Sequence, residues 1–230
     1  MDTFLNQEGV LSVAPYHETR SWFEQGSAFF TIMQMAGMNA FTPFGQTHPP
    51  AGLFGPCLAI SKAHYLRIGG HGAVRDKILE HYEMAGPLAD AGIPINLRCG
   101  RGTLNVRMYP QGLGQVIQGW SKSFASGAGK TPASIMIPII LWIFGMLLTP
   151  LFLLLAILRL DIMAILLWAM AYILFFLQLY WHLWRMGRFK WYTSFLFPVP
   201  LIFFFGLFSR SSFLTNKKRQ VVWKGRVIRK

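Results

Sequence analysis

The sequence predicts an α/β region followed by α-helical transmembrane segments. Of the 230 residues, 53% are hydrophobic and 13% are charged, a balance that excludes an intrinsically disordered chain. The long apolar runs all lie after residue 134, whereas the first 130 residues alternate short β-rich runs with helical patterns. We therefore expect an α/β region over residues 1–130, a membrane region over residues 131–208 and a basic tail over residues 209–230.

Two apolar runs predict a pair of membrane-spanning helices. Residues 135–158 would form a helix of about 36 Å, longer than the roughly 30 Å hydrocarbon core of a bilayer. Residues 162–181 contain Gln178 as a strongly polar residue and end in Tyr180 and Trp181, aromatic residues that suit the headgroup boundary. The short connection between the runs leaves room only for a tight turn, so we expect an antiparallel helical hairpin.

A third apolar segment, residues 191–208, contains Pro198 and Pro200, which favour a break in the helix. The following tail holds eight Lys and Arg residues and no acid, and its export would conflict with the tendency of basic residues to stay in the cytosol. The opening residues MDTFLNQEG have no signal-peptide character. We expect a multi-pass protein of the cell membrane with a re-entrant or interfacial third segment, and with the α/β region and the tail in the cytosol.

The net charge of +13 is unevenly distributed along the chain. Residues 1–134 carry 10 basic and 8 acidic side chains, whereas residues 135–230 carry 12 basic side chains and one acid. Because the excess lies in the membrane-like half, we interpret it as a topology signal and as contact with anionic membrane lipid. Nucleic acid is not an expected partner.

The α/β region is predicted from short apolar patterns. Strands are expected at residues 10–13, 56–60, 93–97 and 103–108. Apolar residues at helical spacing predict a helix over residues 78–88, with Asp76, Glu80 and Glu83 on another face, where solvent exposure is the simplest interpretation. The aromatic and Met-rich segment 21–44 fits either core packing or docking to a membrane surface.

A further amphipathic helix is predicted shortly before the first span. Its apolar stripe consists of Leu113, Val116, Ile117, Trp120 and Phe124. A helix of this kind is expected to lie flat on the cytosolic leaflet and to tie the α/β region to the bilayer. The alternative is burial of the stripe in a globular core.

Familiar metal and catalytic motifs are missing from the sequence. The six histidines show no zinc-site spacing, Cys57 and Cys99 are expected to be reduced structural thiols, and neither a phosphate loop nor a serine nucleophile elbow occurs. Glu80 and His81 remain as adjacent titratable residues near the start of a helix. Either residue type can serve as a general base, a histidine because it titrates near neutral pH and a glutamate where burial makes it more basic.

The order of short motifs resembles the second half of a membrane-bound family 2 glycosyltransferase. These motifs are GPCLAISK at residues 55–62, AHYLRIGGH at residues 63–71, KILEHYEMA at residues 77–85 and a helix with Gly119 and Trp120 directly before the membrane spans. The segments VAPYHETRSWFEQGSAFF, RMYPQG and QGWSKSFASGA are similar to the diaponeurosporenoate glycosyltransferase group, which glucosylates a carotenoid acid. The resemblance covers roughly residues 10–130.

The resemblance implies a partial GT-A, Rossmann-like fold and a set of site residues. Glu80 stands at the Glu, and His81 at the Asp, of the acidic pair that supplies the family's catalytic base, so both are candidate catalytic residues. Trp120 matches the tryptophan of the family's Q/R-x-x-R-W motif. Together with His71 and Gly70 of the GGH element, it is a candidate substrate-binding residue.

The resemblance also implies a nucleotide-sugar donor and a divalent cation. The family binds the cation through a DxD motif in an upstream donor-binding half, but no DxD occurs in this sequence and no metal ligands are assigned. Gly119 further replaces the Arg of the tryptophan motif. We therefore expect the 230-residue chain alone not to transfer sugar.

Two functions remain open from the sequence. The first is a membrane-bound inverting glycosyltransferase, or its acceptor half, that transfers a sugar from a nucleotide-sugar to a lipid, polyisoprenoid or carotenoid-type acceptor. The alternative is a non-enzymatic membrane anchor or subunit whose partner protein supplies the donor-binding half. The missing DxD favours the second function, and the GGH, LEH and GW elements favour the first.

Overall fold

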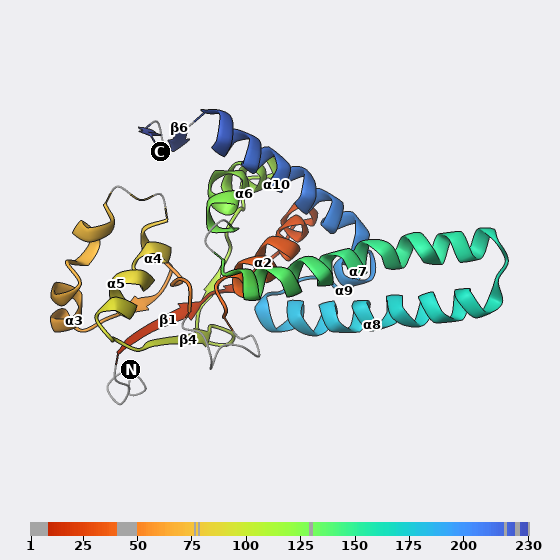
Figure 1. Ribbon diagram of the computed structural model, residues 1–230, viewed down its shortest axis with the longest axis horizontal. Helices are drawn as coiled ribbons and strands as arrows, with labels where there is room; N and C mark the ends of the chain where they lie inside the picture. Colours follow the sequence, from red (N-terminus) through yellow and green to blue (C-terminus); the bar gives the residue numbers. More distant parts are fainter. Residues whose placement is uncertain are drawn as a thin grey trace.

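The computed structural model describes residues 9–40, 50–75, 77, 79–128, 131–218, 220–223 and 226–229. An α/β region lies at one end of the molecule, and two long helices extend side by side toward the other end (Figure 1). The predicted order, an α/β region followed by helices, is confirmed.

A mixed three-stranded sheet forms the centre of the α/β region. Strand β1 (Val10–Ala14) pairs in parallel with β4 (Ile95–Cys99) and antiparallel with β3 (Leu58–Ala59), so the strand order is β3-β1-β4. A second sheet pairs β2 (Tyr16–His17) in parallel with β5 (Asn105–Val106). The four predicted strands are confirmed, with ends that differ by a few residues.

Four short helices connect β3 to β4. They are α3 (Lys62–Arg67), the 3-10 helix η2 (Gly70–Val74), α4 (Glu80–Glu83) and α5 (Ala85–Asp90). Val74, Met84 and Leu88 from these helices are buried together with Val10 and Ile93 in the core of the α/β region.

The helix predicted over residues 78–88 is divided into α4 and α5 at Met84. Pro87 accounts for the division, because it has no backbone N–H to donate to the Glu83 carbonyl and its ring crowds that carbonyl. Two residues of the predicted pattern, Asp76 and Ile78, lie outside the described residues.

A larger core is built from helices on both sides of residue 130. Its helices are α2 (Ala28–Gly37), α6 (Leu113–Ala128), α7 (Ala133–Leu158), α8 (Ile162–Met186) and α10 (Pro198–Lys218). Phe30 lies at its centre, with ring centroids 4.9 Å from Trp120 and 4.9 Å from Phe204. For α2, therefore, core packing is the correct interpretation of the aromatic segment 21–44.

The predicted amphipathic helix forms as α6, but its apolar face lies against protein. Val116 is fully buried and Trp120 is 6% exposed, and both belong to the core shared with α2 and α10. The expectation that this face lies on the leaflet is wrong for these two residues, because α10, from a distant part of the chain, covers it. The side chain of Phe124 lies outside the described residues.

Helices α7 and α8 form the predicted antiparallel hairpin. A three-residue turn joins them, and the Asp161 carboxylate caps α8 by accepting a first-turn N–H at 3.1 Å. Phe152 stacks on Trp168 with ring centroids 4.8 Å apart. Ten residues farther from the turn on each helix, the Trp142 indole N–H donates to the Gln178 side-chain oxygen at 2.8 Å.

Both hairpin helices have the length and composition of membrane spans. They contain 26 and 25 residues, with mean hydropathy of 2.5 and 2.3 over their most apolar windows. Most of these apolar side chains are exposed rather than buried inside the protein. An exposed apolar surface of this extent is suited to hydrocarbon rather than to water.

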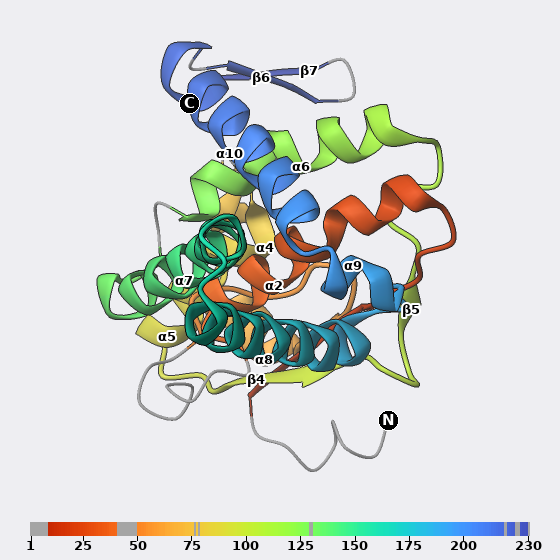
Figure 2. The ribbon, with the colours of Figure 1, turned by 90° about the vertical axis from the view of Figure 1, so that its right-hand side faces the viewer.

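The third apolar segment contains the predicted break. Helix α9 (Trp191–Phe195) ends before Pro198, the first residue of α10, where a helix needs no backbone donor. Helix α10 packs mainly along α6 and α2 (Figure 2). After it, β6 (Gln220–Trp223) and β7 (Arg226–Arg229) pair as an antiparallel hairpin.

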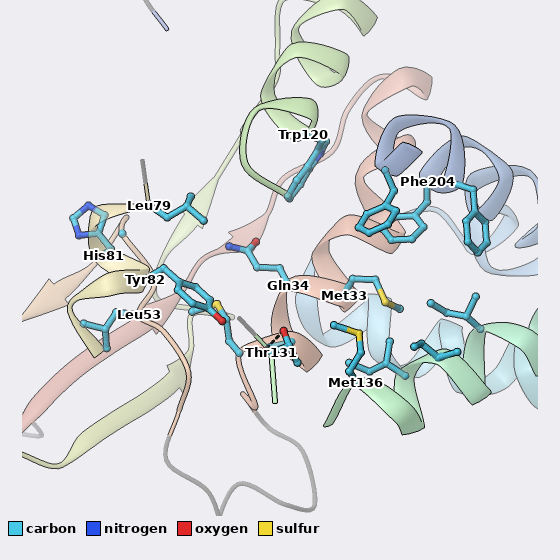
Figure 3. Close-up of a pocket in the computed structure, with 18 of the residues that line it drawn as sticks. Met33, Gln34, Leu53, Leu79, His81, Tyr82, Trp120, Thr131, Met136 and Phe204 are labelled. Atoms are coloured by element: carbon cyan, nitrogen blue, oxygen red, sulfur yellow. Dashed lines mark hydrogen bonds between the residues drawn. The ribbon is translucent and has the colours of Figure 1, made fainter. Parts of the chain in front are cut away.

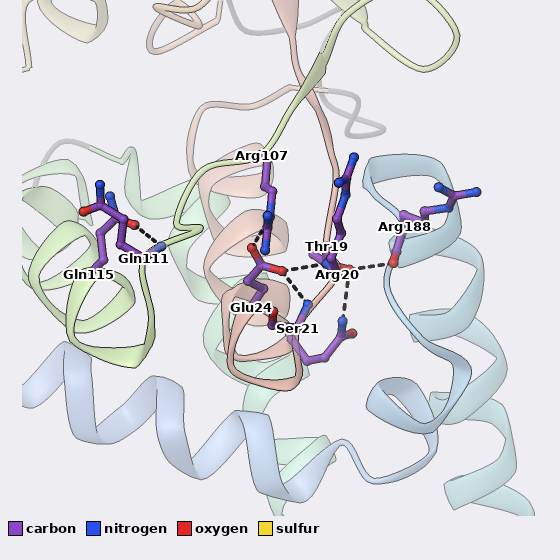
Figure 4. Close-up of polar contacts among 9 residues, drawn as sticks. Thr19, Arg20, Ser21, Glu24, Arg107, Gln111, Gln115 and Arg188 are labelled. Atoms are coloured by element: carbon purple, nitrogen blue, oxygen red, sulfur yellow. Dashed lines mark hydrogen bonds and ion pairs between the residues drawn. The ribbon is translucent and has the colours of Figure 1, made fainter.

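A buried polar network joins the segment before α2 to the chain that follows α8. The Gln25 amide N–H donates to the Thr19 hydroxyl oxygen at 3.0 Å. The Gln25 oxygen accepts hydrogen bonds from the Lys190 N–H at 3.0 Å and the Thr193 hydroxyl at 2.8 Å. Thr19 in turn donates to the Arg188 carbonyl at 2.6 Å (Figure 4). These bonds fix the hairpin relative to α2.

A buried carboxylate joins the segment before α2 to the chain that follows β5. The Glu24 side chain, in the 3-10 helix η1 (Trp22–Ser27), is 4% exposed and lies 2.7 Å from the Arg107 guanidinium. Its other oxygen accepts the N–H groups of Arg20 and Ser21 at 2.6 Å each (Figure 4). Burial raises the pKa of Glu24, but these donors and the Arg107 charge outweigh burial and hold the pKa below its ordinary value.

Candidate active site

A cavity of about 560 Å³ lies between the α/β region and the helices. Its wall comes from α2, the loop before β3, α4, α6, α7 and α10 (Figure 3). Most lining side chains are apolar, and the polar ones are Gln34, Glu80, His81, Tyr82 and Thr131. The size and the few convergent polar groups are typical of a small-molecule site.

Both candidate catalytic residues lie at the α4 end of the cavity. Glu80 begins α4 and is exposed, whereas His81 is half-buried and packs against Gly55, where any Cβ atom would collide with the imidazole. The Nδ1 atom of His81 is buried and has no hydrogen-bond partner among the described residues. In Figure 3 the His81 ring points away from the cavity centre, and Tyr82 points toward it.

The GGH element lies beside His81 rather than in the cavity wall. Gly70 is buried with a φ of +53°, and the Tyr65 ring occupies the space that a side chain at residue 70 would need. The Tyr65 hydroxyl is hydrogen-bonded to His71 Nδ1 at 2.8 Å and accepts the His71 N–H at 3.0 Å. The His71 ring meets the His81 ring edge-on, with centroids 5.7 Å apart. Substrate binding by His71 and Gly70 stays a prediction.

Trp120 lines the cavity from α6 and is held in one orientation. Its indole N–H donates to the Ser27 hydroxyl at 3.0 Å, and the Tyr109 ring meets its ring edge-on at 5.8 Å. Tyr109 also covers Gly119 so closely that a Cβ atom there would collide with the phenol. This packing favours glycine at residue 119.

The opposite end of the cavity is apolar. It is lined by Ile143, Phe144 and Leu147 of α7 and by Phe204, Phe205 and Phe208 of α10. Helix α7 is also half of the hairpin, so the apolar wall continues into the exposed surface of a helix with the character of a membrane span. The cavity therefore connects the Glu80 end to the membrane-like part of the molecule.

Three polar residues of the cavity wall are absent from the sequence prediction. Gln34 lies within the Met-rich run, Tyr82 belongs to the apolar pattern of its helix, and Thr131 follows α6. Burial raises the pKa of Tyr82, although the adjacent Thr131 hydroxyl opposes the shift. The Tyr82 hydroxyl makes no hydrogen bond of ordinary geometry among the described residues. Its place next to the Glu80 and His81 pair was the signal that could have identified it.

The described residues do not form a metal site. No group of three or more His, Cys, Asp or Glu side chains in this part of the chain is arranged to hold a metal ion. The divalent cation that the resemblance implies therefore has no fitting ligand set among them, and no step proposed below passes through it.

Comparison with known proteins identifies relatives of this chain. Over 98% of its length, the chain is 31% identical to 4,4'-diaponeurosporenoate glycosyltransferase of Staphylococcus aureus strain USA300 and of strain NCTC 8325 / PS 47. The predicted resemblance is confirmed. The enzyme of strain MRSA252 is 31% identical over 96% of the chain. No family model and no solved structure matches.

The extent of this similarity corrects one expectation. The similarity covers nearly the whole chain, including the hairpin and α10, rather than stopping near residue 130. The chain spans 62% of the length of the USA300 relative, which is consistent with the predicted correspondence to its C-terminal part. Both the cavity wall from the α/β region and the wall from α7 and α10 lie within the similar part.

Proposed function

We propose that this chain is the acceptor-binding part of a membrane-bound inverting glycosyltransferase. The sugar comes from a nucleotide-sugar, and the acceptor is a lipid, polyisoprenoid or carotenoid-type molecule. The α/β region is part of a GT-A fold on the cytosolic side, and the α7–α8 hairpin crosses the cell membrane. The names of the S. aureus relatives, which state a glycosyltransferase and 4,4'-diaponeurosporenoate, support this class of reaction.

The observation that carries the proposal is the continuity of the cavity. One end holds Glu80 and His81, and the other end is bounded by Ile143 of α7 and Phe204 of α10. An acceptor with a polar end and a long apolar body would place its reactive oxygen near α4 and its body along the membrane helices. Burial of that body removes apolar surface from water and orients the reactive end.

The reaction requires an oxygen of the acceptor to attack the anomeric carbon while the bond from that carbon to the diphosphate breaks. A hydroxyl acceptor must also lose its proton, and Glu80 or His81 would accept it. A carboxylic acid acceptor is already ionised at neutral pH and has little need of a base. A histidine at residue 81 suits such an acceptor better than an aspartate, because two carboxylates close together repel one another.

Acceptor binding is tested with cis-parinaric acid, a fatty acid whose conjugated polyene is fluorescent. Ile143→Trp fills the apolar end of the cavity and is expected to raise the Kd by at least about tenfold. Ile137→Trp is the matched control, because Ile137 is 57% exposed on the same helix and lies outside the cavity wall. Equal affinity of both variants for the polyene would contradict the acceptor site.

The non-enzymatic anchor remains the second candidate function, and sugar transfer separates the two. If the polyene binds in the cavity but no form that includes a donor-binding half transfers sugar, the result would favour the anchor. Transfer that depends on the cavity would favour the enzyme.

A further inference from the structure

Two arginines lie over two exposed tryptophans at the end of α8. The guanidinium carbon of Arg101 is 3.5 Å from the ring centroid of Trp184, and that of Arg185 is 4.5 Å from the ring centroid of Trp181. The two indoles remain about half exposed, 50% for Trp181 and 48% for Trp184. These four residues are called the arginine–tryptophan patch below.

The patch joins two parts of the molecule. Arg101 follows β4 in the α/β region, and the other three residues lie on α8. The Cys99 thiol donates to the Arg185 carbonyl at 3.5 Å, and Figure 1 shows the end of β4 close to the C-terminal end of α8. The patch residues are not part of the cavity wall, so the patch is separate from the candidate active site.

The length of α8 places the patch at a membrane boundary. From Ile162 to Trp181 the helix rises by about 30 Å, which matches the thickness of the hydrocarbon core. If the turn before Ile162 lies at one boundary, Trp181 lies at the other, and Arg185 lies one turn farther at headgroup depth. This step rests on the membrane hairpin of the proposed function.

The patch carries two positive charges, those of Arg101 and Arg185. Within the described part of the chain, no carboxylate lies within 4 Å of Arg101 or Arg185. The neighbouring Arg188 lies 3.6 Å from Glu18, and Lys190 adds a further exposed cation. An anion that meets this surface at headgroup depth would be a lipid phosphate.

We propose that the arginine–tryptophan patch binds the phosphate of an anionic phospholipid in the cytosolic leaflet. A guanidinium stacked on an indole keeps its N–H edge free, and that edge can donate two parallel hydrogen bonds to phosphate oxygens. The indoles themselves favour the headgroup boundary. Because Arg101 and Arg185 come from different regions, one bound lipid would also hold the α/β region against the hairpin.

The test uses the whole chain in phosphatidylcholine nanodiscs. Phosphatidylglycerol with bromine on its acyl chains is titrated in, and quenching of tryptophan fluorescence reports contact. Brominated phosphatidylcholine is titrated in parallel, and Trp181→Phe/Trp184→Phe isolates the signal of the patch. From the patch signal, we expect an apparent affinity for phosphatidylglycerol that exceeds the affinity for phosphatidylcholine by about fivefold for each arginine at low salt. The difference is expected to be smaller at high salt.

Matched variants assign the preference to the two arginines. Arg101→Gln/Arg185→Gln is expected to abolish the preference, and Arg101→Lys/Arg185→Lys to retain part of it because the charges remain. Arg67→Gln/Arg159→Gln removes two exposed cations elsewhere, on α3 and in the hairpin turn, and is expected to retain the full preference.

The outcomes separate this inference from the proposed function. Equal quenching of the patch by both lipids overturns the lipid site and leaves the membrane hairpin intact. An unchanged preference in Arg101→Gln/Arg185→Gln also overturns it. If that variant does not fold, the lysine variant decides: a preference weaker than that of the wild type supports the lipid site, and an unchanged preference overturns it. Absence of quenching by either lipid contradicts the hairpin itself, and the lipid site with it.

Discussion

Glu80 has two candidate roles. Its exposed carboxylate at the start of α4 is either a general base or one side chain of a solvent-exposed helix face. With a hydroxyl acceptor, Glu80→Gln is expected to lower turnover of the assembled enzyme by about 10², the usual scale for loss of a general base. With a carboxylic acid acceptor, the loss is expected to stay below about tenfold, because no proton must be removed. Rates with both acceptors provide the measurement.

The control for Glu80 is its neighbour. Full activity of Glu80→Gln with the hydroxyl acceptor would indicate that His81 is the general base. If His81→Ala were also fully active and correctly folded, the solvated face would be the correct interpretation of this helix.

We expect His17 to make folding stability depend on pH. Its imidazole is 4% exposed and stacks on Phe189 with ring centroids 6.3 Å apart, and burial lowers the pKa of His17 to about 4. The unfolded chain binds a proton near pH 6.5 and the folded chain does not, so stability is fully present above pH 6.5 and falls as the pH drops toward 4. The expected loss in the free energy of unfolding is about 3 kcal/mol.

Thermal unfolding in detergent between pH 7 and pH 4 tests this prediction. His17→Phe keeps an aromatic ring beside Phe189 but cannot titrate, so its Tm is expected to fall less than that of the wild type over this range. Parallel decreases in both proteins would show that other groups control the pH dependence.

At the scale of elements, Gly119 in α6 gives the sharpest prediction. Gly119→Ala would force a Cβ atom into the Tyr109 ring beside Trp120, and it is expected to lower the free energy of unfolding by about 1–3 kcal/mol. Gly114 lies in the same helix with open space around its Cβ position. Gly114→Ala is therefore expected to leave stability unchanged or to raise it by up to about 1 kcal/mol. Equal effects of the two substitutions would contradict the packing of Tyr109 on α6.

Elements defined by local pattern were predictable from the sequence. The hairpin of α7 and α8 follows from two long apolar runs and a short turn, and the break before α10 follows from Pro198 and Pro200. The surface that covers the apolar stripe of α6 was not predictable. A single amphipathic pattern does not show whether its apolar face contacts lipid or another helix from a later part of the chain. The cavity was missed for the same reason, since its wall combines Gln34, Tyr82 and Phe204 from separate segments.

At the scale of the whole molecule, the arrangement predicts a membrane topology. In a cysteine-free background, Leu160→Cys in the hairpin turn is expected to react with an impermeant maleimide in intact cells, because the turn would face the outside. Asn216→Cys is expected to react only after permeabilisation, because basic residues of the tail favour the cytosolic side. Labelling of Asn216→Cys in intact cells would mean that the third apolar segment crosses the membrane.

In the proposed function, one cavity presents a long apolar acceptor to a glycosyl-transfer site. The most direct measurement follows radiolabel from UDP-glucose into the lipid fraction of membranes that contain 4,4'-diaponeurosporenoate. The chain is assayed alone and joined to the part of the S. aureus relative that lies outside the matched region. We expect transfer by the joined form, with a loss of at least about tenfold in Ile143→Trp and none in Ile137→Trp. Equal transfer by the two variants, or none by the joined form, would contradict the proposed function.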